Sequence, residues 1–444
     1  MKKNIAIITY CAGLDNYGHI LQAYALQRYL RDNYKEFETK LIYAHPFGGI
    51  AQKPSKKSCV KIFLEHLTTA RRYFLAYILC LDKYNRRIQK DKNEALKKVI
   101  KEAIREVLEE AKIGKSDNKR IDMLNKKREF ERFKRENIAI HCDDLQDFSG
   151  FGKEYEADCY IVGSDQVWND WGALQRGYTQ GVDFYTLEFL PPNHKSKKIS
   201  YAASLGKVEF GSEGEKAYFK KALAKFDVIS VRESCNIKTL NEIGFKAECV
   251  PDPTQLLTKS DYYKLIDSSI EKCEFDSAKS DGKVRKESVF VYMLGNETSM
   301  DKDSVMAFLE SQNSVIYTNS NVDFSCAWDY KSDFAPTPQE WIACVRDCKL
   351  MITNSFHGCA FAITMNTPFV ALKIGGSRLW RATNTRFYQL FELFGLQNRL
   401  VDNLADLQAQ MNTPIEWDKI NAKLKEWRNV GVEFLDRELK VFMQ

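Results

Sequence analysis

The sequence predicts an α/β protein with two Rossmann-like domains that face a cleft, a GT-B-like arrangement with a helical insertion in the first domain. Three observations support this fold class. Short apolar runs typical of buried parallel strands alternate with helical patterns in both halves, several of these runs end in polar or glycine-containing loops, and one long charged stretch interrupts the alternation. With 444 residues, 44% of them hydrophobic, the chain is long enough for two to three domains with real cores.

The first domain is predicted at residues 1–255. It opens as a βαβ unit, because an apolar strand at 5–10 leads through a loop with Gly and Asn to a helical pattern at 19–31 and a second strand at 39–44. The loop lacks GxGxxG, so no dinucleotide site is predicted. Later strands are expected at 158–162, 199–206, 226–231 and 247–250, and the two prolines of Pro251-Asp252-Pro253-Thr254 close the domain.

A helical insertion is predicted at about residues 48–144, where Lys, Arg and Glu are dense. Within it, residues 60–81, from Val60 to Leu81, have an amphipathic pattern with lysines and arginines beside the apolar face. This pattern is typical of a helical hairpin packed on its own domain, which we favour, and also of a helix that lies on a membrane surface. The following stretch at 86–135 is typical of charged helices exposed to solvent.

The second domain is predicted at residues 256–415 and repeats the alternation. Its strands are expected at 289–294, 314–317, 350–353 and 368–373, with helices at 301–311, 339–347 and 384–394. Residues 416–444 form a separate C-terminal segment with a long amphipathic helix at 417–439. This helix is expected to pack back across the two domains.

Charge and cysteine usage argue against several classes of function. The net charge of +6 is too diffuse for nucleic-acid binding, and it fits an anionic small substrate or an anionic membrane surface. The 12 cysteines form no CxxC pair, and no second pair or histidine cluster follows Cys344 and Cys348, so no metal site is predicted. Free thiols and the lack of a signal peptide predict a cytoplasmic protein. The longest apolar stretch, at 73–81, is far shorter than the roughly 20 residues that span a bilayer.

The stretch at 350–358 contains the first candidate functional residues. An apolar strand breaks at Thr353-Asn354-Ser355-Phe356-His357-Gly358 and continues as a helix of small and apolar residues. Unpaired backbone N–H groups and the positive end of the helix dipole make such a helix start a site for phosphate or carboxylate. His357 is beside this site and can transfer a proton near neutral pH. Taken alone, this stretch slightly favours a histidine that caps or packs the turn.

Two other predicted strand ends carry polar side chains. The strand at 158–162 ends in Gly163-Ser164-Asp165-Gln166-Val167-Trp168-Asn169, a polar composition with one aromatic that is typical of a ligand-binding loop and not of a core. The strand at 226–231 delivers Arg232, whose guanidinium can hold a carboxylate or phosphate with two hydrogen bonds. A surface pairing of Arg232 with Glu233, or a charge at a helix start, is the structural alternative.

Six motifs together resemble the polysaccharide pyruvyl transferase family. They occur in the family's order and span most of the chain, and although each is weak alone, jointly they are specific. The motifs are Asn16-Tyr17-Gly18 with the LQAYALQ run at 21–27, the run at 163–169, Ser200-Tyr201-Ala202-Ala203-Ser204, Ser230-Val231-Arg232-Glu233, Asp252-Pro253-Thr254, and the run at 353–358.

The resemblance implies an enzyme that transfers a pyruvyl group from phosphoenolpyruvate to two hydroxyls of a sugar, forming a ketal and releasing phosphate. The sugar would belong to a cell-surface polysaccharide or its lipid-linked precursor, phosphoenolpyruvate would be a co-substrate, and no cofactor is expected. His357 would be the general acid, and Asp165 would take a proton from an attacking hydroxyl. The donor would be bound by Arg232, Ser355, Gly358, Lys373 and Arg378, and the acceptor by Asn16, Tyr17, Gln166, Trp168 and Asn169.

One residue departs from the family pattern. Many members carry Arg-Leu-His where this chain has Ser355-Phe356-His357, so an arginine that would hold the donor is missing. Either Lys373, Arg378 or Arg381 replaces its charge, or the donor differs.

Two other functions are consistent with the sequence. A glycosyltransferase that uses a nucleotide sugar would share the two-domain cleft, but it commonly needs a carboxylate near the second-domain site, and no Glu closely follows His357. A saccharide-binding protein without catalysis would fit the missing arginine, with the helical insertion as its docking surface. If the acceptor is lipid-linked, residues 60–81 are the predicted peripheral contact with the inner face of the membrane.

Overall fold

The computed structural model describes residues 2–11, 16–44, 126–143, 156–170, 174, 180–191, 193–270, 288–295, 298–312, 315–320, 334–376 and 381–443. The chain divides into two compact units, one formed by Met1–Pro46 with Met123–Gln444 and the other by Phe47–Asp122. The second unit lies outside the described residues, and so does the predicted membrane contact at residues 60–81.

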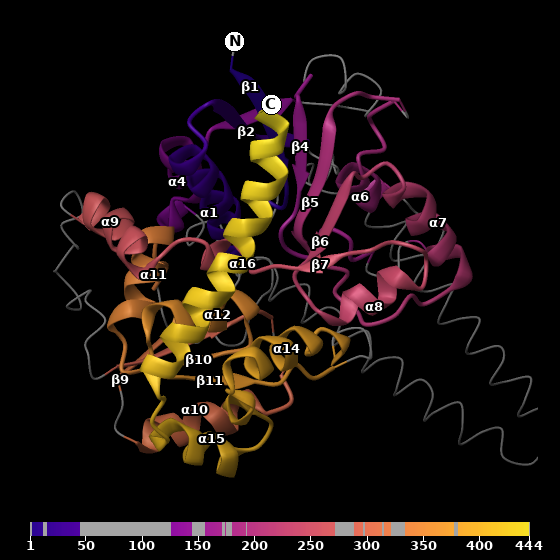
Figure 1. The fold of residues 1–444 in the computed structure, drawn as a ribbon. Helices are drawn as coiled ribbons and strands as arrows, with labels where there is room; N and C mark the ends of the chain where they lie inside the picture. Colours follow the sequence, from indigo (N-terminus) through magenta and orange to yellow (C-terminus); the bar gives the residue numbers. More distant parts are fainter. Residues whose placement is uncertain are drawn as a thin grey trace, which may run out of the picture. The chain divides into compact units, whose positions relative to one another are not determined.

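The N-terminal part of the described chain builds a seven-stranded sheet in the order β3-β2-β1-β4-β5-β6-β7, in which the paired strands are parallel (Figure 1). The order reverses between β1 and β4, and open α/β sheets bind their ligands at such a switch point, beyond the carboxyl ends of the strands. The strands are β1 (Lys3–Ile8), β2 (Phe37–Ala44), β3 (Ile140–Asp143), β4 (Cys159–Val162), β5 (Lys197–Ala203), β6 (Val228–Val231) and β7 (Glu248–Cys249).

Helix α1 (Tyr17–Asn33) joins the first two strands and is buried on most of its surface. It begins at Asn16, whose side-chain oxygen accepts the N–H groups of Gly18 and His19 and so satisfies two donors of the first turn. This capping fixes the helix start beside the switch point. The other helices of this part are α4 (Phe130–Asn137), α6 (Gln180–Asp183), η3 (Phe184–Thr186), α7 (Glu213–Leu223), α8 (Cys235–Asn241), η4 (Pro253–Gln255) and α9 (Lys259–Ile270).

The predicted insertion extends too far at its C-terminal end. Residues 130–143 form α4 and β3, and β3 pairs with β2, so this segment belongs to the first sheet. Gln27 of α1 holds it in place, because its side chain donates to the backbone oxygen of Ala139 (2.9 Å) and accepts from the backbone nitrogen of the same residue (2.7 Å). The many charged residues of α4 made its buried face, which contains Phe130 and Phe133, hard to recognise in the sequence.

The C-terminal part builds a second parallel sheet with five strands in the order β12-β11-β10-β8-β9. In chain order this is the 2-1-3-4-5 winding, with its switch point between β8 and β10. The predicted α/β fold with two Rossmann-like, GT-B-like sheets is confirmed. The elements are β8 (Ser288–Met293), α10 (Lys302–Ser311), β9 (Val315–Ser320), α11 (Pro338–Asp347), β10 (Leu350–Thr353), α12 (Phe356–Met365), β11 (Phe369–Leu372), α14 (Thr385–Phe394), η6 (Gln397–Arg399), β12 (Leu400–Val401) and α15 (Leu404–Asn412).

The last helix, α16 (Trp417–Met443), contacts elements of both sheets. It packs against α12 and α14, and its Asp436 accepts a hydrogen bond from the hydroxyl of Tyr34 at the end of α1 (2.7 Å). Glu438 pairs with Lys197 of β5 at 3.0 Å. The helix therefore joins the two sheets through contacts with both.

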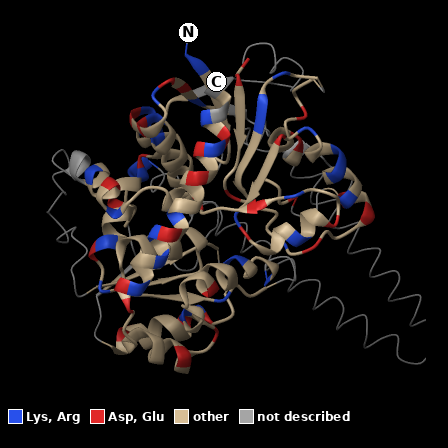
Figure 2. Ribbon diagram, in the orientation of Figure 1, with Lys and Arg blue, Asp and Glu red and all other residues tan. Residues whose placement is uncertain are grey.

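Lys, Arg, Asp and Glu residues occur in many of the described helices, and residues of both signs occur along the length of α16 (Figure 2). This distribution is that of helices with one face in solvent and one in a core. Within the described ranges, none of the helices combines the length and the apolar character that crossing a bilayer requires.

The close contact of α16 with the first sheet gives a test of this packing. Gly431 lies where a Cβ would be 2.6 Å from Cγ of Pro251 and 2.6 Å from the hydroxyl oxygen of Tyr201. At an exposed helix position Gly→Ala would stabilise by about 0.8–1.0 kcal/mol. Here the overlap opposes that gain, because the proline ring cannot rotate away, and overpacking costs about 1–3 kcal/mol.

We expect Gly431→Ala to lower the urea midpoint and the melting temperature. Asn429→Ala, at an exposed position of the same helix, is the matched control and should leave both unchanged or slightly raised. A Gly431→Ala protein as stable as the control would contradict the close packing of α16 on Pro251 and Tyr201.

Candidate active site

Three strand ends bring the candidate residues together. Asp165 follows β4, Arg232 follows β6, and His357 lies in the first turn of α12, directly after β10. Each of these strands ends at the carboxyl edge of its sheet, and β4 and β10 flank the two switch points. Parallel winding therefore places three polar side chains from distant parts of the sequence at the sheet edges where ligands bind.

The carboxylate of Asp252 is the centre of this cluster. One of its oxygens, Oδ2, accepts hydrogen bonds from Nη1 of Arg232 (3.0 Å) and Oγ of Ser164 (2.9 Å), and it lies 3.4 Å from Nε2 of His357. The other oxygen accepts from the backbone N–H (3.0 Å) and the hydroxyl (2.8 Å) of Thr254. The side chains of Arg232 and His357, which are more than a hundred residues apart in the sequence, thus both contact Oδ2 of Asp252.

The environment of Asp252 keeps it ionised although it is fully buried. Burial by itself raises the pKa of this carboxyl group. The charges of His357 and Arg232 and the N–H of Thr254 act in the opposite direction and hold the pKa of Asp252 below its usual range. A permanent negative charge therefore lies between the two sheets.

The guanidinium of Arg232 is shared among three carboxylates. Its Nε donates to Glu233 (3.0 Å), its Nη1 donates to Asp252, and its Nη2 lies 3.7 Å from Oδ1 of Asp165. The ring of Phe356 covers it at 4.2 Å, a cation–π contact. Burial acts to lower the pKa of Arg232, but the carboxylates of Glu233, Asp165 and Asp252 outweigh it and raise this pKa, so the residue stays charged.

Asp165 contacts a second histidine, His19 of α1. Oδ2 of Asp165 lies 3.3 Å from Nε2 of His19, while its Oδ1 accepts the backbone N–H of Gln166 (2.8 Å). The backbone of Asp165 has a φ of +71° and its carbonyl accepts the N–H of Ser204 (2.9 Å). The loop after β4 is therefore held on β5, and the carboxylate is held against α1.

His357 packs directly on the backbone of Gly18. A Cβ at residue 18 would overlap Nδ1 and Cγ of the imidazole, so only glycine allows the two helix starts to approach this closely. The glycine of the Asn16-Tyr17-Gly18 motif thus has a packing reason. It brings the first turn of α1, with His19, next to the first turn of α12, with His357.

Several polar atoms of the cluster are buried without a well-aligned hydrogen bond to any described residue. They are Oδ2 of Asp165, Nη2 of Arg232, Oε2 of Glu233 and Nε2 of His357. Buried polar groups are nearly always hydrogen-bonded in folded proteins, and exceptions gathered in one place need a reason such as a catalytic or ligand-binding role. This group contains both donors and acceptors.

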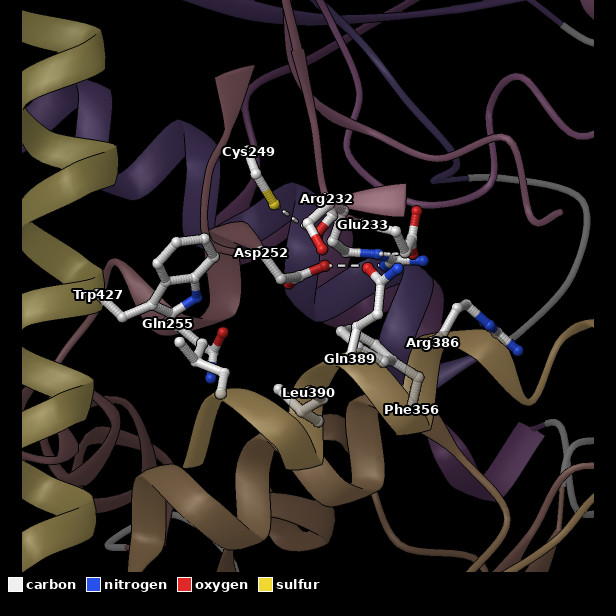
Figure 3. Close-up of a pocket in the computed structure, with 12 residues that line it drawn as sticks. Arg232, Glu233, Cys249, Asp252, Gln255, Phe356, Arg386, Gln389, Leu390 and Trp427 are labelled. Carbon is white, nitrogen blue, oxygen red and sulfur yellow. Dashed lines mark hydrogen bonds and ion pairs between the residues drawn. The ribbon is translucent and has the colours of Figure 1, made fainter. Parts of the chain in front are cut away.

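A cavity of about 190 Å³ lies beside the cluster and is lined from both sheets. Figure 3 shows Arg232, Glu233 and Asp252 of the first sheet opposite Phe356 and Arg386 of the second. Arg386, in the first turn of α14, is buried, and its Nε donates to the backbone oxygen of Thr383 (3.2 Å). Burial, followed by the charge of Arg232, lowers the pKa of Arg386 to about 10. Within the described part of the chain, no carboxylate forms an ion pair with it.

The residues predicted to bind the donor have different positions. Oγ of Ser355 accepts the N–H of Gly358 at 3.2 Å and so caps α12, and a Cβ on Gly358 would meet Oγ1 of Thr353 at 2.8 Å. Both residues therefore serve the turn between β10 and α12 in this structure. Lys373 pairs with Asp402 at 2.6 Å, and the structure does not bring it to Asp252. Arg378 lies outside the described residues.

The residues predicted to bind the acceptor are mostly committed to the fold. Asn16 caps α1, and Tyr17 is fully buried and stacks on Trp341 with ring centroids 5.3 Å apart. Trp168 is fully buried, and its Nε1 donates to the backbone oxygen of Tyr185 (3.0 Å). Gln166 and Asn169 lie in the loop after Asp165 and are linked by a side-chain hydrogen bond of 2.8 Å, and the amide atoms that make this bond lie against Gly206.

Comparison with known proteins identifies the family. A model of the family described as polysaccharide pyruvyl transferase matches residues 16–375, which is most of the chain and includes Asp165, Arg232, Asp252 and His357. The chain belongs to the polysaccharide pyruvyl transferase family. The family prediction made from the six sequence motifs is therefore confirmed, and the matched residues include the cluster around Asp252.

Solved structures resemble this family member only distantly. A glycotransferase of kitacinnamycin has 11% identity and a TM-score of 0.42, with 99% of this chain and 100% of that chain covered. The UDP-GlcNAc 2-epimerase from Neisseria meningitidis has 10% identity and a TM-score of 0.40, with 98% and 100% covered. An uncharacterized protein from Klebsiella pneumoniae has 15% identity and a TM-score of 0.29, with 61% and 85% covered. No curated protein matches this sequence.

Sequence reasoning did not assign a role to three residues of this candidate site. Asp252 occurs in one of the family motifs, but the two adjacent prolines were interpreted as the end of the first domain. His19 directly follows the Asn16-Tyr17-Gly18 motif and opens a helical pattern, so the sequence gives no sign that it differs from the other helix residues. Arg386 stands in a basic stretch, and only the fold distinguishes it from the neighbouring arginines.

The position of Asp252 gives a second prediction. Asp252→Asn removes the negative charge that Arg232 and His357 both contact. Breaking a buried ion pair by removing one partner costs about 3–5 kcal/mol. We expect a large loss of the free energy of unfolding in urea at pH 7. Because the pKa of Asp252 is lowered in the folded state, the wild-type advantage is present at neutral pH and is lost as the pH falls below about 4.

The control is Asp32→Asn, which removes a half-exposed carboxylate paired with Arg28 on α1 and should change stability by less than about 1 kcal/mol. Equal stability of the Asp252→Asn and Asp32→Asn proteins at pH 7 would contradict the central role of Asp252.

Proposed function

We propose that this protein transfers a pyruvyl group from phosphoenolpyruvate to two hydroxyls of a saccharide, forming a ketal and releasing phosphate. The observation that carries the proposal is the group of unpaired donors and acceptors around Asp165, Arg232 and His357, in a chain that belongs to a pyruvyl transferase family. The acceptor in this proposal is a cell-surface polysaccharide or its lipid-linked precursor.

The negative charges of the donor need a cation that is not already neutralised. Arg232 is shared among Asp252, Glu233 and Asp165, whereas no described carboxylate pairs with Arg386. A buried guanidinium without a carboxylate partner is stabilised by a bound anion. Arg386 therefore replaces the arginine missing at position 355, in place of Lys373, which is paired with Asp402.

The ketal carbon of the donor becomes electron-poor when its methylene group gains a proton. In the proposed mechanism His357 gives this proton to the methylene carbon, and the carboxylate of Asp252 stabilises the positive charge that develops on the neighbouring carbon. Asp252, 3.4 Å from Nε2, orients the imidazole for this transfer. One hydroxyl then adds to that carbon, phosphate leaves, and the second hydroxyl completes the ketal.

The overall proposal is tested by ligand-dependent stability and by turnover. Phosphoenolpyruvate should raise the melting temperature, because a ligand that binds only the native state stabilises it by mass action, and a panel of nucleotide sugars should not. Phosphate release from phosphoenolpyruvate should require a saccharide acceptor. A melting shift with a nucleotide sugar and none with phosphoenolpyruvate would overturn the proposal in favour of glycosyl transfer.

The proton transfer by His357 gives a third prediction. We expect His357→Gln to lower kcat for acceptor-dependent phosphate release by about 10²–10⁴, the usual contribution of a positioned acid or base, with little change in donor affinity. Calorimetric titration of phosphoenolpyruvate checks the affinity. Turnover within about tenfold of wild type would remove His357 from the chemistry.

The charge of Arg386 gives a fourth prediction. Arg386→Lys keeps a charge but loses the planar pair of donors, and Arg386→Ala loses both, so donor affinity should fall in the order Arg, Lys, Ala. The alanine variant should bind phosphoenolpyruvate at least about tenfold more weakly, because a hydrogen bond to a charged group contributes about 1.5–3 kcal/mol. Arg28→Lys, at an exposed position of α1, is the control. Unchanged donor affinity in both Arg386 variants would exclude this residue from the donor site.

A further inference from the structure

We propose that His19 is the general base that removes the proton from the attacking acceptor hydroxyl, and that Asp165 is the positioning residue that orients its imidazole. This inference rests on the proposed function and names the group that activates the acceptor. It replaces the direct role for Asp165 that the sequence suggested.

The fold holds His19 in one place. It lies in the first turn of α1, where its backbone N–H bonds to the cap residue Asn16 (3.4 Å), and its Nε2 lies 3.3 Å from Oδ2 of Asp165. Its ring packs against Tyr10, with centroids 5.2 Å apart. This contact has ion-pair distance but is not aligned as a hydrogen bond in this structure. If the proton of the neutral imidazole is on Nε2, which faces the carboxylate, the lone pair is on Nδ1, as in a histidine base oriented by an aspartate.

The side chain of His19 is more exposed to solvent than the other side chains of the cluster. Its side chain is 21% exposed, whereas the side chains of Asp165, Arg232, Asp252 and His357 are between 0% and 6% exposed. In this proposal the acceptor hydroxyl approaches the exposed part of the imidazole. It cannot reach the carboxylate of Asp165 without displacing His19 or Arg232, because both Asp165 oxygens already face protein groups.

The charges around His19 favour its neutral form. Burial lowers the pKa of His19, Asp165 acts to raise it, and His357, Arg232 and Arg386 lower it further, with the result that the pKa lies below its usual value. These groups belong to the loop after β4, to α12, to the segment after β6 and to α14, and Tyr10 is the neighbour after β1. At neutral pH the imidazole is therefore able to accept a proton.

The proton balance of the reaction fits two histidines with opposite roles. His19 takes the proton of the first hydroxyl as a lone pair of the hydroxyl oxygen forms the bond to the ketal carbon, and the O–H electron pair stays on that oxygen. His357 gives a proton to the methylene carbon, which becomes a methyl group. The second hydroxyl also loses its proton when its oxygen bonds to the ketal carbon and the phosphate C–O bond breaks. Of the two hydroxyl protons, one restores His357 and the other leaves with phosphate, so both histidines return to their starting states.

The test compares His19→Gln, His19→Ala and Asp165→Asn with wild type, and uses His194→Gln as the control. His194 lies outside the cluster, where it contacts Ser196, and its replacement should leave turnover unchanged. We expect His19→Gln to lower acceptor-dependent kcat by about 10²–10⁴, with phosphoenolpyruvate affinity within about threefold of wild type. Imidazole in the buffer should restore part of the activity of His19→Ala, and a role limited to packing would give no such rescue.

The pH dependence gives a second readout. Since the base must be neutral, wild-type kcat/KM should fall as the pH drops through the lowered His19 pKa, at a pH below about 6.5, and this acidic limb should be absent in His19→Gln. Asp165→Asn should lower kcat more than it raises the KM for the acceptor, because the imidazole loses its orientation.

The outcomes separate the two proposals. If wild type releases no phosphate from phosphoenolpyruvate with any acceptor, the proposed function falls and the role of His19 falls with it. If wild type turns over and His19→Gln is equally active with the same acidic limb, only the role of His19 is overturned. If Asp165→Asn is inactive while His19→Gln is active, Asp165 is itself the base.

Discussion

The buried carboxylate of Asp252 is the constraint on which the rest of the site depends. A charge removed from water must be paired and hydrogen-bonded, and here the partners are Arg232 after β6, Ser164 after β4 and His357 after β10. These partners come from both sheets. The position of one oxygen atom therefore fixes how the two halves of the site approach each other, and Gly18 allows the final contact because a side chain there would overlap His357.

The two buried arginines at the candidate site have different surroundings. Arg232 is neutralised by neighbouring carboxylates and covered by Phe356, which makes it a rigid internal cation. Arg386, from the opposite sheet, is also buried, and no carboxylate among the described residues pairs with it. Ser355 caps its own helix, so its hydroxyl serves the backbone of the turn between β10 and α12.

The fold could be predicted in most respects because buried parallel strands leave a strong signal in apolar runs. The strands at 3–8, 159–162, 228–231 and 350–353 were all expected within a few residues. The segment at 130–143 was missed, because its buried side chains are interleaved with lysines, arginines and glutamates that the rest of the charged stretch shares. The segment belongs to the sheet because β3 pairs with β2, and such pairing cannot be recognised from the local amino-acid composition.

For the site, the sequence by itself determined which strand ends carry polar groups, which family the motifs belong to, and that His357 and Arg232 are candidates. Only the tertiary structure decided which of these groups meet. In the structure His357 and Arg232 both contact Asp252, and His19 lies against Asp165. Tyr17 and Trp168, which were predicted to bind the acceptor, are buried in the core. The physical reason is that a sequence motif gives only the type of each side chain. The burial, charge pairing and direction of these side chains are set by contacts with segments that can be more than a hundred residues away.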